Sequence, residues 1–396
     1  MRRSRGFVRA LLLEVRILAV RVGFTLGRVL PLRRRVVLAT THDPVLRGNL
    51  AIIRDELARR HPAIPLVVLA NGPARGRRGR LAALGGAVRA GYHLATARAF
   101  VVDDYYFPLY VVRPRRGTTI LQAWHASGAF KQFGYSVLDK SFGADETLTG
   151  RVAIHSNYDV CLVSAASVAP HYAEAFRLPL DRFVSRLGIP RTDVLFGEER
   201  IARQVAELRR RYAIPDGRRV ILYAPTFRGD TIAAARFDDT LDFRLLRDTL
   251  GEDHVVLVRL HPFIRERAPI DPTLAGFAID VSAHSDINEL LPVSDLLVTD
   301  YSSVIYEYSL LGRPMVFFAP DHEAYERERG FYFDYRSGVP GPVFETTDEV
   351  ARHIRAGVFD TARVEAFGRA SFDVADGGAT ARVIDEIVLP ALRRRG

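Results

Sequence analysis

Cysteine and lysine are nearly absent from this 396-residue chain, and each absence narrows its possible functions. The single cysteine, Cys161, excludes an internal disulfide and a thiolate metal site, and its apolar neighbours indicate a buried, inert thiol in a reducing compartment. The 11 histidines form no H-E-x-x-H or H-x-H pair. We therefore predict no bound metal and no other cofactor.

Familiar nucleotide-binding and ester-cleaving signatures are missing too. No G-x-G-x-x-G follows an apolar run, no P-loop lysine precedes Ser or Thr, and no G-x-S-x-G elbow is present. These absences exclude the usual dinucleotide, P-loop and α/β-hydrolase sites. The adjacent acids Asp103 and Asp104 suggest a metal-dependent transferase, but two neighbouring carboxylates are a weak signal.

Positive charge is concentrated at the amino terminus. The formal net charge is +10, and residues 1–35 contain ten arginines against the single acid Glu14. The rest of the chain is almost balanced, whereas a nucleic-acid surface needs Lys and Arg spread over the folded body. The composition therefore argues against nucleic acid as a partner and indicates a different target for the basic segment.

Residues 1–35 have the pattern of a helix that lies on a membrane surface. Charged residues interrupt every apolar run of the ~20 residues needed to span a bilayer. On a helical projection one face carries Leu11, Val15, Leu18, Val22 and Val29, and another carries Arg2, Arg5, Arg9 and Arg16. Such a helix suits the anionic surface of the cell membrane, as a peripheral protein on its cytoplasmic face. A core helix and a signal peptide are the alternatives.

Beyond residue 35, β-rich apolar runs alternate with helical stretches, which is typical of an α/β fold with parallel sheets. The expected strands are 36–40, 65–70, 99–104, 119–124, 159–165, 182–188, 218–226, 254–259, 277–281, 295–299 and 314–319. We predict two Rossmann-like domains, 36–200 and 201–375, that face a central cleft. A carboxyl-terminal helix, 376–396, is expected to pack back on the first domain.

Two further segments are rich in arginine. Residues 72–86 combine Gly with Arg and predict a mobile, solvated loop. Arg393, Arg394 and Arg395 end the carboxyl-terminal helix and offer a second contact with a membrane surface.

Two histidines directly follow predicted strands, at the place where open α/β sheets bind their ligands. His125 has this position in the first domain, and a histidine with a pKa near its reference value of about 6.5 can accept a proton from an attacking hydroxyl group. Ser127 and Gly128 allow close approach of the backbone to a ligand on this acceptor-side loop, and Lys131 is one of two lysines in the chain. His261 has the equivalent position in the second domain, so the two rings are expected to face each other. A structural histidine is the alternative for both.

The segment from Asp300 to Glu307 predicts a site for the phosphates of a nucleotide donor. A strand ends at Asp300, and Ser302 or Ser303 can cap the next helix, whose free N–H groups and dipole suit a pyrophosphate. Glu307 lies on the same helix face as Ser303, where it can accept from ribose or polyol hydroxyl groups. Generic capping and a structural glutamate are the alternatives.

Thr226 and Arg228 follow the first strand of the second domain. An arginine there can hold the phosphate whose charge grows as a nucleotide leaves. An ordinary surface ion pair is the alternative for Arg228.

Taken in order, five segments resemble the CDP-glycerol glycerophosphotransferase family, the teichoic-acid primases and polymerases. They are WHASGAFKQFG, GIPRTDVLF, YAPTFRGD, RLHP and TDYSSVIYEYSLLGRP, within roughly residues 120–320. The resemblance implies a GT-B fold, with acceptor chemistry on the first domain and a CDP-linked donor on the second. It also implies that His125 and His261 take part in the reaction and that Ser302 and Ser303 belong to the donor-phosphate site.

One position departs from the family pattern. Ala126 stands where the family usually has glycine after the first histidine. The added methyl group restricts the backbone and the approach of a ligand, which bears on the acceptor more than on the class of reaction.

The sequence thus predicts an enzyme that moves glycerol phosphate or another polyol phosphate from a CDP-activated donor to a lipid-linked acceptor, with release of CMP, in the synthesis of a teichoic-acid-like polymer. His125 would be the base, and His261, Arg228 and the two serines would hold the diphosphate. Two alternatives stay open: a GT-B sugar transferase that uses a UDP- or GDP-sugar, and a non-catalytic membrane-bound scaffold.

Overall fold

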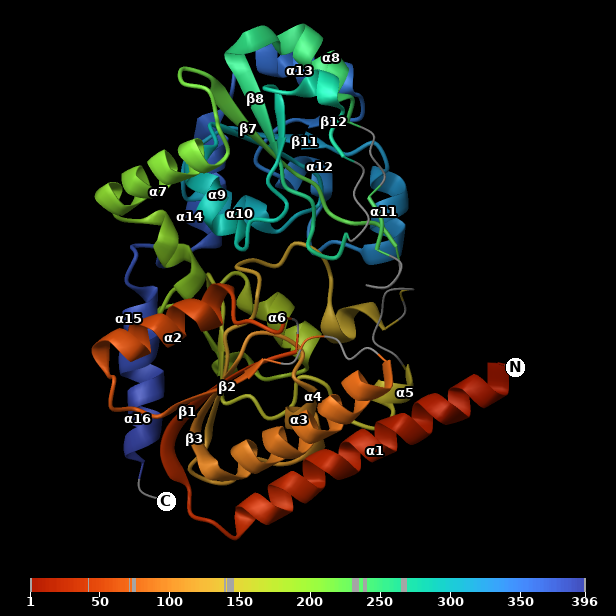
Figure 1. The fold of residues 1–396 in the computed structure, drawn as a ribbon, viewed down its shortest axis with the longest axis vertical. Coiled ribbons are helices and arrows are strands. Elements are labelled where there is room, and N and C mark those ends of the chain that lie inside the picture. The colour runs from red at the N-terminus through yellow and green to blue at the C-terminus, as the bar shows by residue number, and fades with distance from the viewer. Residues whose placement is uncertain are drawn as a thin grey trace.

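The computed structural model describes residues 2–41, 43–70, 72, 76–138, 140, 146–229, 235–237, 241–264 and 269–394, without the side chains of 2–9, 76–78, 80, 146 and 147. Figure 1 shows two α/β domains, one above the other, with the long helix α1 on the outside of the lower one. The predicted pair of parallel-sheet domains is confirmed.

The first domain is built on six parallel strands in the order β2-β1-β3-β4-β5-β6. They are β1 (Arg33–Thr40), β2 (Leu66–Ala70), β3 (Ala97–Val102), β4 (Thr119–Gln122), β5 (Val160–Leu162) and β6 (Phe183–Val184). The six residues from Arg35 to Thr40 are all buried, without alternation. This is the pattern of a parallel strand whose two faces are both covered by helices.

Helices from both ends of the chain cover this sheet. The amino-terminal ones are α1 (Arg2–Arg28), α2 (Gly48–Arg60), α3 (Gly76–Thr96), α4 (Phe107–Val111), α5 (Glu146–Thr149) and α6 (Ala169–Phe176). α1 and α3 pack on one face, and α2 packs on the other. The 3₁₀ segment Pro190–Leu195 and α7 (Glu198–Arg211) then lead to the second domain.

The second domain repeats the arrangement, with six parallel strands in the order β12-β11-β10-β7-β8-β9. They are β7 (Arg219–Ala224), β8 (His254–Val258), β9 (Ala278–Asp280), β10 (Leu296–Thr299), β11 (Met315–Phe318) and β12 (Val343–Phe344). The helices are α8 (Phe243–Leu250), α9 (Ile287–Leu290), α10 (Val304–Ser309), α11 (His322–Arg329), α12 (Tyr335–Gly338), α13 (Thr347–Ala356) and α14 (Thr361–Ser371). Because sheet ligands bind beyond the carboxyl ends of parallel strands, the loops after these strands form one wall of the site.

The carboxyl-terminal residues return to the first domain. They form α15 (Ala379–Val383), a π-helical turn and α16 (Leu389–Arg393), of which Val383 and Leu392 join the core that contains Val36 of β1. Arg60 of α2 donates to Asp385 at 2.8 Å. Arg395, one of the three predicted membrane-contact arginines, lies outside the described residues.

α1 is docked on α3 through glycines, which allow the two backbones to approach closely. A Cβ atom on Gly23 would stand 1.9 Å from the carbonyl oxygen of Val88, and one on Gly91 would stand 2.1 Å from that of Val20. Val20 is fully buried and Phe24 is 8% exposed in this contact. One face of α1 is therefore buried in the core of the first domain.

The predicted loop at residues 72–86 is wrong from Gly76 onward, where the structure has a helix. Residues 73–75 lie outside the described residues, and α3 already begins at Gly76. Gly and Arg gave no apolar period there, yet the same helix continues into Ala87, Ala90 and Leu94, which are buried against the sheet. Tertiary packing thus overrides the weak local propensity.

Candidate active site

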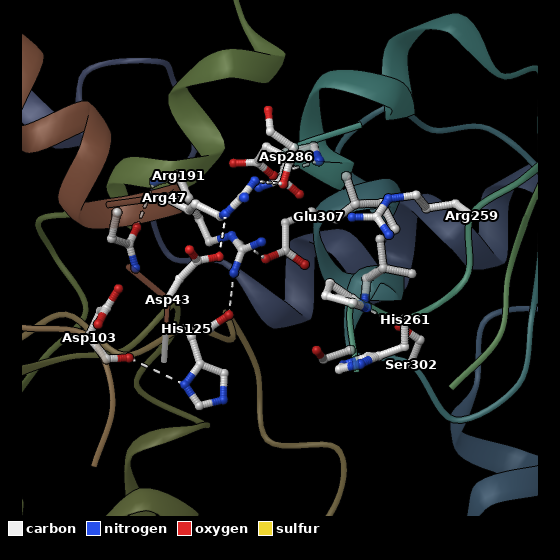
Figure 2. A pocket seen from close by; sticks show the side chains of 18 of the residues that line it. Asp43, Arg47, Asp103, His125, Arg191, Arg259, His261, Asp286, Ser302 and Glu307 are labelled. Carbon is white, nitrogen blue, oxygen red and sulfur yellow. Dashed lines mark hydrogen bonds and ion pairs between the residues drawn. The ribbon is translucent and has the colours of Figure 1, made fainter. Parts of the chain in front are cut away.

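The carboxyl ends of the strands of both sheets meet at one cavity of about 270 Å³. From the first domain its wall includes Asp43, Arg47, Asp103, Asp104, His125 and Arg191. From the second domain it includes Arg259, His261, Asp286, Ser302, Ser303 and Glu307. Figure 2 shows His125 and Asp103 on one side and His261, Ser302 and Arg259 on the other. Five of the predicted site residues thus line one cavity: the two histidines, the two serines and Glu307.

His125 stands at the end of β4 with its side chain half exposed. Its Nδ1 lies 3.3 Å from the carbonyl oxygen of Asp103 and 3.6 Å from Oδ1 of Asp104. Both neighbours are acceptors, so they favour the tautomer with a proton on Nδ1 and make Nε2 the basic nitrogen. The ring stacks on Trp124 with centroids 4.5 Å apart, which fixes its orientation.

His261 follows β8 on the opposite wall. Its Nδ1 accepts from the backbone N–H of Phe263 at 3.2 Å. Its ring centroid lies 4.8 Å from that of Phe227 and 4.6 Å from that of Phe263. These contacts hold the ring at the wall of the cavity.

Ser302 and Ser303 stand between β10 and α10 and line the cavity, and Figure 2 shows Ser302 close to His261. The Ser302 hydroxyl oxygen lies 3.4 Å from the N–H of Val304, and Ser303, the residue before the helix, makes no side-chain cap. The helix ends at Ser309, and the residues up to Gly312 form tight turns before β11. The Ser302–Ser303 segment therefore presents hydroxyl and N–H groups to the cavity.

Thr226, Arg228 and Asp300 lie behind the cavity wall and are bonded to one another. Thr226 Oγ1 donates to Asp300 at 2.9 Å, and the Arg228 guanidinium pairs with Asp300 at 2.9 Å and with Asp321 at 2.6 Å. Burial alone would lower the pKa of Arg228, but these two carboxylates raise it above its ordinary value. None of the three predicted donor contacts lines the cavity. Arg228 therefore neutralises two acids beside the cavity, and its contact with a donor phosphate stays a prediction.

The predicted acceptor-side residues Ser127, Gly128 and Lys131 are placed at the contact between the domains and do not line the cavity. Ser127 is fully buried, and a Cβ atom on Gly128 would stand 2.3 Å from the ring of Tyr306. Lys131 pairs with Phe331 in an isolated antiparallel bridge, and its Nζ lies 3.4 Å from the Tyr325 hydroxyl. The glycine thus serves close packing between domains, where a ligand contact was expected.

Glu307 lines the cavity, but its carboxylate is already engaged. Oε1 accepts from the Ser127 hydroxyl at 2.8 Å and lies 3.3 Å from Nε of Arg191. Its side chain is 3% exposed. The predicted contact with ribose or polyol hydroxyl groups has to compete with these two partners.

Sequence reasoning missed several polar residues of the cavity wall, among them Asp104, Arg191 and Arg259. Asp104 was considered only as half of a metal-binding pair. Arg191 lies in the segment GIPRTDVLF and Arg259 begins the segment RLHP, and both arginines were used only as part of the family resemblance. Position directly after a strand was the available signal for Asp104 and Arg259, and for Arg191 the available signal was its place in a family segment. Within the part of the chain that the structure describes, no group of three or more His, Cys, Asp or Glu side chains could hold a metal ion.

Two parallel-sheet domains with a shared cavity at their strand ends define a protein of the GT-B type. A profile of the family described as CDP-Glycerol:Poly(glycerophosphate) glycerophosphotransferase matches residues 24–389, and the chain belongs to this family. The resemblance found in the sequence is thereby confirmed.

Relatives and solved structures agree with this assignment. The chain is 39% identical over 365 residues to a teichoic acid ribitol-phosphate primase of Bacillus spizizenii, covering 91% of this chain and 93% of the relative. It is 35% identical over 370 residues to a teichoic acid poly(ribitol-phosphate) polymerase of the same species, covering 93% and 58%. The structure of the wall teichoic acid polymerase TagF superposes with a TM-score of 0.77 at 22% identity, over 99% of this chain and 97% of that chain, which shows a common fold.

Another histidine of the first domain, His155, packs against Trp124 beside the His125 loop. It is fully buried, stacks on Phe176 with centroids 4.0 Å apart and packs edge-on against Trp124 at 5.6 Å. Burial lowers the pKa of His155 to about 3. The neutral ring is therefore part of the support of Trp124, and protonation opposes folding.

We expect His155→Phe to flatten the pH dependence of stability. The unfolded chain takes up a proton near pH 6.5 and the folded chain only near pH 3, so stability falls as the pH drops below about 6.5 by roughly 1.4 kcal/mol per pH unit for this group. Urea titrations at pH 7.5, 6.0 and 5.0 measure the slope, with His61→Phe at the end of α2 as the control. Equal slopes in wild type and His155→Phe would contradict this assignment.

Proposed function

We propose that the protein transfers a glycerol phosphate or ribitol phosphate unit from a CDP-activated donor to a hydroxyl group of a lipid-linked acceptor at the cytoplasmic face of the membrane. The observation that carries the proposal is that His125 of one domain faces His261, Ser302 and Ser303 of the other across one cavity. Membership of the family supports the CDP donor. The first relatives, which are ribitol-phosphate primases and polymerases, support ribitol as strongly as glycerol.

In the proposed reaction the acceptor oxygen attacks the polyol-bearing phosphorus of the donor in line. A bond forms between that oxygen and phosphorus, and the bond from phosphorus to the CMP oxygen breaks. The hydroxyl proton passes to Nε2 of His125, whose Nδ1 faces Asp103 and Asp104. His261 and the Ser302–Ser303 segment stabilise the charge on the departing CMP.

The exposed face of α1 supports attachment to a membrane. Leu11, Leu18 and Val22 are 54%, 61% and 42% exposed, on the side of α1 that faces away from α3. Figure 1 shows this helix along the outer edge of the first domain. None of the helices described here is long and apolar enough to cross a bilayer. The helix therefore offers an apolar stripe of the kind that enters a lipid interface from one side.

The predicted basic face of α1 is only partly described. The side chains of Arg2, Arg5 and Arg9 lie outside the described residues. Arg16 is turned toward the protein, with its guanidinium carbon 4.6 Å from the ring centroid of Phe107, and burial lowers its pKa. Arg16, Arg21 and Arg28 are all exposed, so the contact with Phe107 covers only part of the Arg16 side chain.

His125→Ala tests the reaction. Without the base we expect kcat to fall about 10²–10⁴-fold, while CDP still binds within about twofold of the wild-type affinity. Release of CMP from CDP-glycerol and CDP-ribitol measures the rate, and titration calorimetry measures CDP binding. His353→Ala, on α13 away from the cavity, is the matched control. A folded His125→Ala protein that turns over at the wild-type rate would refute this role.

The double variant Leu18→Glu with Val22→Glu tests the membrane contact. Each apolar side chain withdrawn from the interface removes roughly 1.5 kcal/mol or more, so binding to vesicles of phosphatidylglycerol and phosphatidylcholine should weaken at least about tenfold. Vesicle flotation measures it. Val358→Glu, which changes a 75% exposed side chain of the second domain, should leave binding unchanged. Equal flotation of all three proteins would exclude α1 as the contact.

A further inference from the structure

The backbone that carries His125 is held from several sides by buried side chains. Asn49 of α2, 3% exposed, donates through Nδ2 to the carbonyl oxygens of Ala123 at 2.9 Å and Trp124 at 2.7 Å. Trp124 has a φ of 53°, in the left-handed region that non-glycine residues rarely adopt. Such a conformation persists only where the surroundings impose it. Asn49 is one part of those surroundings.

Arg191 is the second part. Its backbone N–H donates to Oδ1 of Asn49 at 2.8 Å, and its guanidinium donates to the carbonyl oxygen of His125. The same guanidinium lies 3.3 Å from Glu307, with side chains that are 15% and 3% exposed. Figure 2 shows Arg191 between His125 and Glu307. Arg191 therefore connects the backbone of the His125 loop to a carboxylate of the second domain.

Glu307 also accepts from Ser127, two residues after His125, at 2.8 Å. It lies on α10, which begins directly after Ser302 and Ser303. One short helix thus carries the proposed donor-phosphate segment at its start and the carboxylate that holds the His125 loop one turn later. The buried carboxylate of Glu307 thus links the proposed donor-phosphate segment to the loop that carries His125.

We propose that Arg191 and Glu307 act as an interdomain strap that positions His125 relative to the donor, which makes both of them positioning residues. The proposal rests on the proposed function for its kinetic consequence. Because a displacement of about 1 Å can cost about 10²-fold in rate, loosening the strap lowers kcat even though neither side chain exchanges a proton with the acceptor. The other role for Glu307, a direct contact with the donor ribose, predicts weaker donor binding instead.

Glu307→Gln separates the two roles, since glutamine keeps the shape and a hydrogen-bond acceptor for Ser127 but removes the charge opposite Arg191. We expect kcat to fall about 10- to 100-fold, with the KM for CDP-ribitol or CDP-glycerol and the calorimetric Kd for CDP within about twofold of wild type. A Kd that rises tenfold or more with unchanged kcat would overturn the strap in favour of a ribose contact. Ser127→Ala, a milder change, should lower kcat in the same direction.

A double-mutant cycle tests whether the two residues act as one unit. Glu307→Gln combined with Arg191→Gln should lose no more kcat than the worse single variant, because either change already opens the strap. The control is the exposed pair Arg186 and Glu386, whose Gln variants should retain wild-type kcat. Additive losses at Arg191 and Glu307 would contradict a shared role.

Hydrogen–deuterium exchange tests the strap without any turnover. In both Glu307→Gln and Arg191→Gln, amides in residues 123–128 should exchange faster, while those of β1 and β7 keep the wild-type rate. Unchanged exchange at 123–128 would overturn the proposal. If the wild-type chain released no CMP from either CDP donor, the proposed function would fail, and exchange at 123–128 would still decide the strap.

Discussion

The insertion of Phe130 into the second domain is the contact on which the site depends. Although it belongs to the His125 loop, Phe130 is 2% exposed within the core of the other domain, with ring centroids 5.4 Å from Phe331 and 5.3 Å from Phe333. Backbone hydrogen bonds flank it, from Gln132 N–H to Gly330 at 3.0 Å and from Tyr332 N–H to Phe130 at 3.1 Å. Burying such a ring contributes roughly 1.5–3 kcal/mol, enough to hold the loop across the domain boundary. His125 is thereby presented to the donor wall.

The same contact bears on the proposed reaction, in which a membrane-bound acceptor and a soluble donor would meet at one cavity. α1 and the carboxyl-terminal helix both pack on the first domain, the domain that supplies His125. An acceptor in the lipid surface would thus reach the cavity from the first domain, and a nucleotide from the second. The Phe130 contact and the Arg191–Glu307 strap fix the position of the His125 loop relative to the wall that the second domain forms.

Sequence patterns were sufficient for the strands and for much of the site, for local reasons. Buried parallel strands are continuous apolar runs, and His125, His261 and Ser302 directly follow such runs. The patterns did not reveal contacts between residues that lie far apart in the chain: Arg228 is neutralised by Asp321, 93 positions away, and Ser127 bonds to Glu307, 180 positions away. The start of α3 was missed for the same reason, because this helix packs against both the sheet and α1, and local propensity does not reveal such contacts. A position directly after a strand predicts that a residue lies at the cavity. It does not predict whether the side chain faces the cavity or pairs with another residue beside it.

The most direct test of the central claim is the mass of the product formed on a defined lipid-linked disaccharide. The acceptor is incubated with the protein and, in separate reactions, CDP-glycerol, CDP-ribitol, a UDP-sugar and a GDP-sugar. The account predicts addition of one or more glycerol phosphate or ribitol phosphate units with one CMP released per unit. A sugar added from a UDP- or GDP-sugar, or no product from any donor with a protein that still binds membranes, would contradict it.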